Sequence, residues 1–157
     1  PVDRVVAAKA SGFREALDPG CAGYAERIVQ NASALADALA NQGFRLVSGG
    51  TDNHLLLVDL RTFDEELTGK EAQEVLDLGG VTLNRNTIPD DPRSPFVTSG
   101  VRMGVASVTT QGMGVEEMAK IADFTARILR QRHDDDAVEA IAKEVADLCA
   151  QFPPYPD

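Results

Sequence analysis

Apolar residues recur every three or four positions in several stretches of the chain, which is the spacing of one face of an α-helix. The first stretch ends before Pro19-Gly20 and carries Val2, Val6, Ala10, Phe13 and Leu17. Four further stretches predict helices at about 22–41, 69–78, 115–132 and 135–148. Thr68 and Glu71 have the spacing of a capping box before the third of these helices.

Shorter runs alternate between apolar and polar residues or are continuously apolar, as β-strands are. They predict strands at about 44–47, 54–60, 81–83 and 101–105. The order is two helices, a strand pair, a helix, two strands and two helices. This order predicts a two-layer α/β (α+β) domain, in which helices pack on a small antiparallel or mixed sheet. No repeat or long linker divides the chain, so residues 1–157 are expected to form one domain.

A long segment without periodicity, residues 84–102, separates the last two predicted strands. Its three prolines exclude a helix and favour a stiff, extended path. Long ordered loops are uncommon in compact domains and are usually functional. Arg102 ends the segment between Gly100 and Gly104, and a guanidinium fixed at a strand start is suited to bind a carboxylate through two hydrogen bonds. Composition alone gives equal weight to a second interpretation, in which this segment is a plain surface connection.

Charge and cysteine content narrow the classes of partner. The net charge of −10 argues against nucleic acid and anionic membranes as partners. No apolar run approaches the ~18 residues of a membrane span. Cys21 and Cys149 are distant and lack metal-ligand spacing, which suits free thiols in a reducing cytosol. The start at Pro1, without a methionine or a signal peptide, indicates a piece of a longer protein.

The residues do not make a complete catalytic set. His54 follows a turn at a strand start and is expected to be structural, whereas His133 is expected to be solvated. No cluster has the spacing of a metal site. The lysines fall on predicted helices in polar surroundings, which does not favour Schiff-base chemistry; they are Lys9, Lys70, Lys120 and Lys143. Arg102 is therefore the one candidate for binding an anion.

Two irregular segments resemble signatures of serine hydroxymethyltransferase. The first is Ser-Gly-Gly-Thr-Asp-Asn-His-Leu at 48–55, followed by Leu-Val-Asp-Leu at 57–60. The second, at 84–102, contains Asn-Thr-Ile-Pro and Asp-Pro-Arg-Ser-Pro-Phe-Val-Thr-Ser-Gly-Val-Arg. Residues 5–10, residues 109–113 and the final Pro-Pro-Tyr-Pro also fit the C-terminal part of this family.

The resemblance implies an aminotransferase-like pyridoxal-phosphate enzyme, which interconverts serine plus tetrahydrofolate with glycine plus 5,10-methylenetetrahydrofolate. It implies that Arg102 binds the carboxylate of the amino acid and that Asn86 lies near the folate pteridine. It also implies that Ser94, Pro95 and Phe96 line the folate site. The parent enzyme would be a cytoplasmic homodimer or homotetramer without a metal.

The chain departs from the family pattern at several positions, and these departures determine whether we expect it to be active. The threonine-rich run with the cofactor lysine is absent, as are the large-domain residues that hold pyridoxal phosphate. Arg4 stands where many members have histidine, and residues 104–107 read Gly-Val-Ala-Ser where most have Gly-Thr-Pro-Ala. We therefore expect an inactive C-terminal small domain without catalytic residues of its own.

This hypothesis makes a structural expectation, and two alternatives compete with it. Residues 1–20 would form the helix that leads out of a missing large domain, with an apolar face around Val6, Ala10 and Phe13 left exposed. One alternative is a stand-alone, non-catalytic domain that binds an amino acid or another small carboxylate through Arg102. A weaker alternative is a pure interaction domain.

Overall fold

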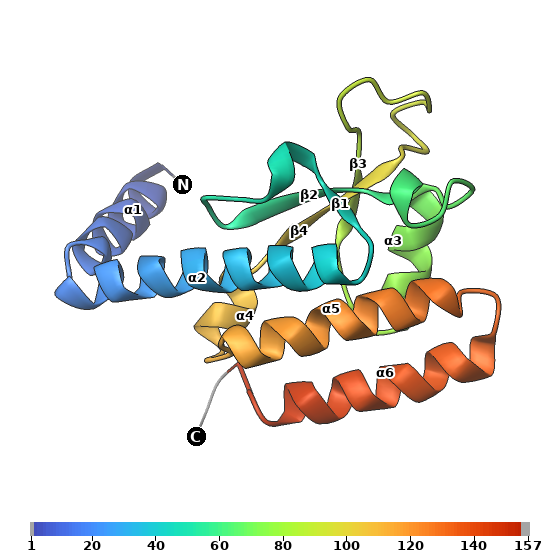
Figure 1. The fold of residues 1–157 in the computed structure, drawn as a ribbon. Coiled ribbons are helices and arrows are strands. Elements are labelled where there is room, and N and C mark those ends of the chain that lie inside the picture. The colour runs from blue at the N-terminus through green and yellow to red at the C-terminus, as the bar shows by residue number, and fades with distance from the viewer. Residues whose placement is uncertain (1, 155–157) are drawn as a thin grey trace.

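A computed structural model describes residues 2–154; Pro1, Tyr155 and Pro156, which belong to segments considered above, lie outside the described residues. The elements follow one another along the chain as six helices and four strands within this range (Figure 1). They are α1 (Val2–Ala16), α2 (Pro19–Asn41), β1 (Arg45–Leu46), β2 (Leu55–Asp59), α3 (Gly69–Leu78), β3 (Asn84–Asn86), β4 (Gly100–Gly104), α4 (Ala106–Thr110), α5 (Val115–Arg130) and α6 (Asp135–Ala150).

The four strands form one antiparallel sheet in the order β1-β2-β4-β3. Helix α2 contacts β1 and β2 and packs along α5, while α6 packs on α5 on the side away from the sheet (Figure 1). Helix α3 contacts β3 and β4 and joins that end of the sheet to α5 and α6. The predicted α/β domain with a small sheet and a helical layer is thus confirmed, and its sheet is antiparallel.

The sheet has one helix-covered face and one open face. Alternate residues of β2 and β4 point into the core and are at most 6% exposed; they are Leu56, Val58, Val101 and Met103. They meet buried side chains of α2 and α5, among them Leu35, Leu39, Met118 and Ile128. The intervening residues belong to the open face, because side chains alternate along a strand; they include Leu55, Leu57, Arg102, Asn84 and Asn86.

The third strand lies at Asn84–Asn86, so the prediction of residues 81–83 was wrong. The N–H of Val81 donates to the carbonyl of Leu76 and closes the end of α3, which keeps Val81 out of the sheet. Val81 and Leu83 still pack against the core, which accounts for their apolar character. The observed strand is anchored to α3, because the N–H of Arg85 donates to Gln73 Oε1 at 2.9 Å.

One helix boundary and one additional helix also differ from expectation. Helix α2 begins at Pro19 rather than near Ala22, because Asp18 caps it through the N–H of Gly20 at 2.8 Å and proline is suited to the first helical position. The short helix α4 was not predicted. It lacks an apolar stripe, and its end is tied to α2 by Asn31 Nδ2, which donates to Thr109 Oγ1 at 2.8 Å.

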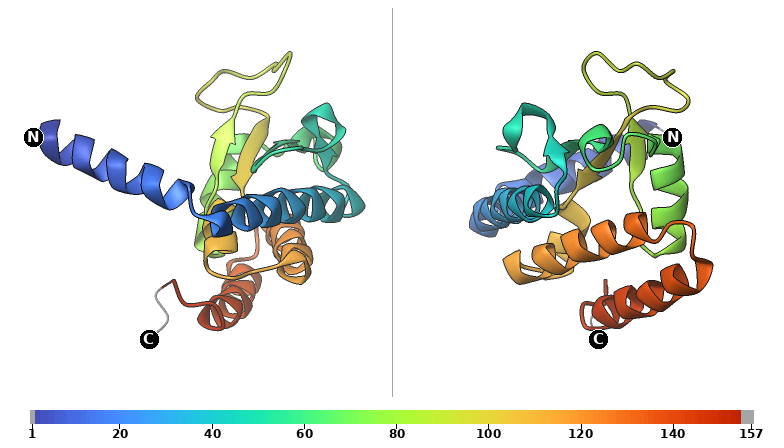
Figure 2. Two further views of the ribbon diagram at one scale, coloured as in Figure 1. Left: turned by 90° about the vertical axis from the view of Figure 1, so that its left-hand side faces the viewer. Right: turned by 45° about the vertical axis from the view of Figure 1, so that its right-hand side comes forward.

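Helix α1 projects away from the rest of the described chain (Figure 2). None of its residues is buried, and Phe13 is 69% exposed. The expected exposure of the apolar face around Val6, Ala10 and Phe13 is therefore confirmed. Between residues 2 and 154, none of the helices is both long and apolar enough to cross a membrane.

Candidate functional site

A pocket of about 620 Å³ opens on the open face of the sheet. Arg102 and Asn86 line it from β4 and β3, and Leu55 and Leu57 line it from β2. The connection between β1 and β2 supplies another wall through Ser48, Gly50, Thr51, Asp52 and Asn53. The pocket therefore unites both of the irregular sequence segments, which lie far apart along the chain.

Arg102 occupies the middle of this face. The antiparallel register places it opposite Leu57 on one side and Asn84 on the other. Its side chain is exposed, and its Nε donates to Asn84 Oδ1 at 3.1 Å. Among the residues that the structure describes, no carboxylate lies within ion-pairing distance of Arg102. Its positive charge therefore remains available to a ligand.

The wall formed by the β1–β2 connection is held by its own hydrogen bonds. Thr51 Oγ1 donates to the carbonyl of Leu55 at 2.6 Å, and the N–H of Leu55 donates to Asn53 Oδ1 at 2.8 Å. Ser48 adopts a positive φ of 69°, which turns the chain sharply at the pocket rim. These side chains satisfy the backbone locally and hold the wall in one conformation.

The proline-rich loop, residues 87–99, is ordered by Asp91. Its carboxylate accepts hydrogen bonds from the backbone N–H groups of Ile88, Arg93 and Ser99 and from the hydroxyl of Ser99. Burial raises the pKa of Asp91, but the hydrogen bonds together outweigh this effect and hold that pKa below its usual value. Arg93 secures the loop further by donating to the carbonyls of Leu67 and Glu65.

The residues predicted for the folate site separate into two groups. Asn86 lines the pocket together with Arg102; its Nδ2 donates to the carbonyl of Thr87 at 2.7 Å, and its Oδ1 accepts no hydrogen bond from the described residues. Ser94, Pro95 and Phe96 lie in the loop and are exposed, with Phe96 at 78%. They are not among the residues that line the pocket.

The sequence reasoning missed Asn84, which contacts Arg102 directly. The available signal was its position two residues before Asn86, because residues i and i+2 of a strand share a face. The pattern of residues 84–102 predicts an irregular segment, whereas the structure places Asn84 in β3. Asp91 and Arg93 were likewise treated as part of a non-periodic segment, although Asp and Ser in such loops commonly bond to nearby backbone groups.

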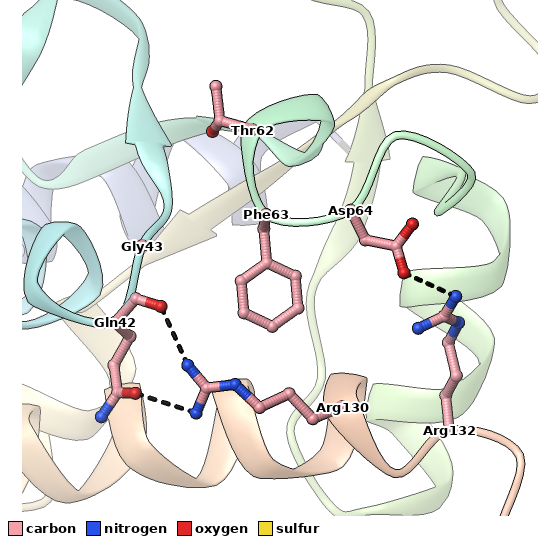
Figure 3. A pocket seen from close by; sticks show the side chains of 7 residues that line it. All are labelled: Gln42, Gly43, Thr62, Phe63, Asp64, Arg130 and Arg132. Atoms are coloured by element: carbon pink, nitrogen blue, oxygen red, sulfur yellow. Dashed lines mark hydrogen bonds and ion pairs between the residues drawn. The ribbon is translucent and has the colours of Figure 1, made fainter.

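A second pocket, of about 340 Å³, contains two arginines whose donors are already engaged (Figure 3). Arg130 donates to the side-chain and backbone oxygens of Gln42 and lies over the ring of Phe63. Arg132 pairs with Asp64 at 2.8 Å and with Glu71 at 3.2 Å. These contacts fasten the end of α5 to the segments before β1 and α3. The pocket thus has a structural explanation, unlike the pocket at Arg102.

Among the described residues, the buried charged side chain is that of Asp59, which is 1% exposed. It accepts hydrogen bonds from Nε and Nη2 of Arg61 at 2.9 and 2.8 Å and from Nη1 of Arg45 at 2.9 Å. The bonds from Arg61 lower the pKa of Asp59 most, and they outweigh the effect of burial, which raises it. This cluster stabilises the sheet beside the pocket.

These features define a small antiparallel α/β domain with an arginine-bearing pocket on the open face of its sheet. The model of one protein family, described as serine hydroxymethyltransferase, matches residues 1–125. The chain belongs to the serine hydroxymethyltransferase family. The matched region extends from α1 into α5 and includes Arg102, Asn86 and the 87–99 loop.

Proposed function

We propose that this chain is the C-terminal small domain of a serine hydroxymethyltransferase, which interconverts serine plus tetrahydrofolate with glycine plus 5,10-methylenetetrahydrofolate. In this proposal Arg102 binds the carboxylate of serine or glycine. Asn86, Ser94, Pro95 and Phe96 contribute to the folate site. The observation that carries the proposal is the exposed guanidinium of Arg102, unpaired by any described carboxylate, in a pocket of a chain that belongs to this family.

The chemistry of Arg102 supports this role. Its Nε is engaged by Asn84, which leaves the Nη1 and Nη2 groups to donate two parallel hydrogen bonds to a carboxylate. A carboxylate held at two points has a fixed orientation, so the bonds at the neighbouring Cα are fixed as well. Such positioning determines which bond of a substrate is aligned for reaction.

The folate assignment rests on Asn86 and on the 87–99 loop. The uncommitted Oδ1 of Asn86 is suited to accept an N–H of the pteridine ring, since it lines the same pocket as Arg102. Phe96 and Pro95 offer an exposed apolar surface to the rings of the ligand. Because Asp91 already orders the loop, little conformational entropy would be lost on binding.

Pyridoxal phosphate supplies the stabilisation of the carbanion in this reaction, but the residues of this chain do not fit its covalent attachment. The four lysines lie exposed on α1, α3, α5 and α6, and none lines the Arg102 pocket. Lys70 and Lys143 are paired with Glu74 and Glu139. We therefore assign the cofactor and the catalytic residues to a large domain of the parent enzyme, packed against the apolar face of α1.

The remaining parts of the proposal concern the parent enzyme as a whole. We propose a homodimeric or homotetrameric, cytoplasmic enzyme whose partners are the small molecules serine, glycine and folate. The chain alone is proposed to be inactive. Mixing it with pyridoxal phosphate is expected to give no absorbance band of a protein-bound aldimine, and such a band would contradict the assignment of the cofactor to another domain.

The proposal is tested by Arg102→Lys in the enzyme that contains this chain. Lysine keeps the charge but not the paired donors, so the KM for serine is expected to rise by about tenfold or more. Arg127→Lys is the matched control, because Arg127 is anchored to Glu144 on α6, away from the pocket. An unchanged KM for serine in Arg102→Lys would refute the role of Arg102. Specific binding of glycine by the chain alone would favour a stand-alone binding domain.

A further inference from the structure

The contact between Arg102 and Asn84 is built into the register of the sheet. Asn84 is the cross-strand partner of Arg102 in the β3–β4 pair, so their side chains emerge side by side on the open face. Arg102 Nε donates to Asn84 Oδ1 at 3.1 Å. This is the one hydrogen bond between the Arg102 guanidinium and the described residues, and it therefore determines how the group is oriented.

The orientation of the Asn84 amide is itself fixed. Its Nδ2 donates to the carbonyl of Arg85 at 2.8 Å, which leaves Oδ1 toward Arg102. Turning the amide over would bring two donors together at Arg102 and two acceptors together at Arg85. Both hydrogen bonds would then be lost, so the neighbouring backbone carbonyl selects the amide orientation that the arginine requires.

A comparison with the other arginines shows why an amide at this position is informative. Within residues 2–154, three arginines donate Nε–H to a side chain. Arg61 is anchored by Asp59 and Arg132 by Glu71, and both of these acceptors are carboxylates that neutralise the guanidinium. Of these three, only Arg102 donates its Nε–H to a neutral group. Arg93 and Arg130 also donate to neutral oxygens, but through their Nη groups. A neutral acceptor fixes the guanidinium and leaves its full charge for an incoming anion.

From this geometry we infer that Asn84 is a positioning residue for the binding of the substrate carboxylate by Arg102. The inference rests on the proposed function and deepens it, because it assigns a role to a residue that does not itself touch the substrate. Asn84 holds Nε, and the two Nη groups consequently face the pocket. Asn86, on the same strand and face, is engaged with Thr87 rather than with Arg102, so its replacement is a contrast in which the KM for tetrahydrofolate, and not the orientation of Arg102, is expected to change.

The test compares Asn84→Ala, Asn86→Ala, Arg102→Ala and the double variant Asn84→Ala/Arg102→Ala in the enzyme that contains this chain. Asn84→Ala is expected to raise the KM for serine by about tenfold, since a hydrogen bond to a charged group is lost. The kcat is expected to fall less than the KM rises, because Arg102 still binds the carboxylate in the ground state and the transition state but orients it less precisely. The KM for tetrahydrofolate should stay within twofold in Asn84→Ala and rise in Asn86→Ala.

The double variant separates positioning from a general structural role. If Asn84 acts through Arg102, the double variant should have the same KM for serine as Arg102→Ala alone. Fully additive losses would show independent action and overturn the inference, as would an unchanged KM in Asn84→Ala.

Asn84→Asp provides a second variant of the same shape. It would pair with Arg102 and compete with the substrate, so it too should raise the KM for serine; a native KM would contradict the inference. If Arg102→Ala itself leaves the KM unchanged, the proposed function fails, which is a distinguishable result.

Discussion

Asp91 and Ser99 close the proline-rich loop on itself. The carboxylate of Asp91 accepts a hydrogen bond from the N–H of Ser99 at 2.9 Å and another from its hydroxyl at 2.7 Å. Ser99 is fully buried and directly precedes β4, which carries Arg102. The loop and the start of the arginine-bearing strand are thus fixed by the same side chain.

Asp91→Ala is expected to loosen the loop, because it leaves the buried N–H of Ser99 without its partner. The expected loss of unfolding free energy is about 1–3 kcal/mol, and the KM for tetrahydrofolate should rise. Hydrogen exchange of the Ser99 amide gives the direct measurement. Asp90→Asn is the control, since asparagine tolerates the positive φ of 54° at that position. Unaltered exchange at Ser99 in Asp91→Ala would disprove the assignment.

The Asp59 cluster predicts a pH dependence of stability. The pKa of Asp59 is lower in the folded chain than the usual unfolded value of about 3.9. The cluster therefore contributes fully above about pH 5, and its contribution is lost as the pH falls through 4 toward the lowered value. Asp59→Asn is expected to lower the unfolding free energy by roughly 2–3 kcal/mol at pH 7. Urea denaturation at several pH values should show this difference narrowing in acid, and a constant difference would count against it.

The two arginines of this cluster should contribute unequally. Arg61 donates two side-chain hydrogen bonds to Asp59 and is 32% exposed, whereas Arg45 donates one and is 59% exposed. Arg61→Ala is therefore expected to lower the unfolding free energy more than Arg45→Ala. The comparison needs only denaturation curves of both variants, and a larger effect at Arg45 would reverse the proposed ranking.

The close packing around Gly69 predicts that this position does not tolerate a side chain. A Cβ there would overlap the hydroxyl of Thr98 and the carbonyl oxygen of Gly100, and the Gly100 backbone cannot move without disturbing β4. Gly69→Ala is expected to cost more than about 3 kcal/mol of unfolding free energy. Gly12→Ala is the control, because a Cβ at Gly12 meets nothing within 4 Å and alanine favours a helix. Equal stability of the two variants would contradict the close packing at Gly69.

The apolar face of α1 should contribute little to the stability of this chain by itself. Phe13 is 69% exposed, so Phe13→Ser is expected to change the unfolding free energy by less than about 0.5 kcal/mol. Leu35→Ala, at a position that is 2% exposed, should cost about 2–5 kcal/mol. In the complete enzyme Phe13→Ser should become destabilising if α1 packs on a large domain. A neutral effect there would argue against that packing.

Much of the fold could be predicted because it depends on local patterns. The three-to-four spacing located α1, α5 and α6, and the continuous apolar run located β2. Local patterns do not state which strands pair, however, and the order β1-β2-β4-β3 brings together residues that are distant in sequence. The apolar residues Val81 and Leu83 were mistaken for a strand because they pack on the core without joining the ladder.

The candidate site was foreseen only in part for the same reason. Arg102 stood out as a cation between two glycines, and the family match includes it. The position of Asn84 two residues before Asn86 indicates only that the two share a face of a strand. Its contact with Arg102 depends on the pairing of β3 with β4, which the sequence does not specify. The hydrogen bonds of Asp91 likewise depend on a loop conformation that three prolines restrict but do not determine.

The anchoring of β3 to α3 helps to decide which side chains of β3 face the pocket. β3 is a three-residue outer strand, and slippage by a single position would exchange its two sides. The side chain of Arg85 would then lie on the open face of the sheet, where the pocket is. The side chains of Asn84 and Asn86 would point toward the helices. The hydrogen bond from the Arg85 N–H to Gln73 Oε1 opposes that shift, so Gln73 on α3 maintains the strand alignment on which the proposed binding of the carboxylate depends.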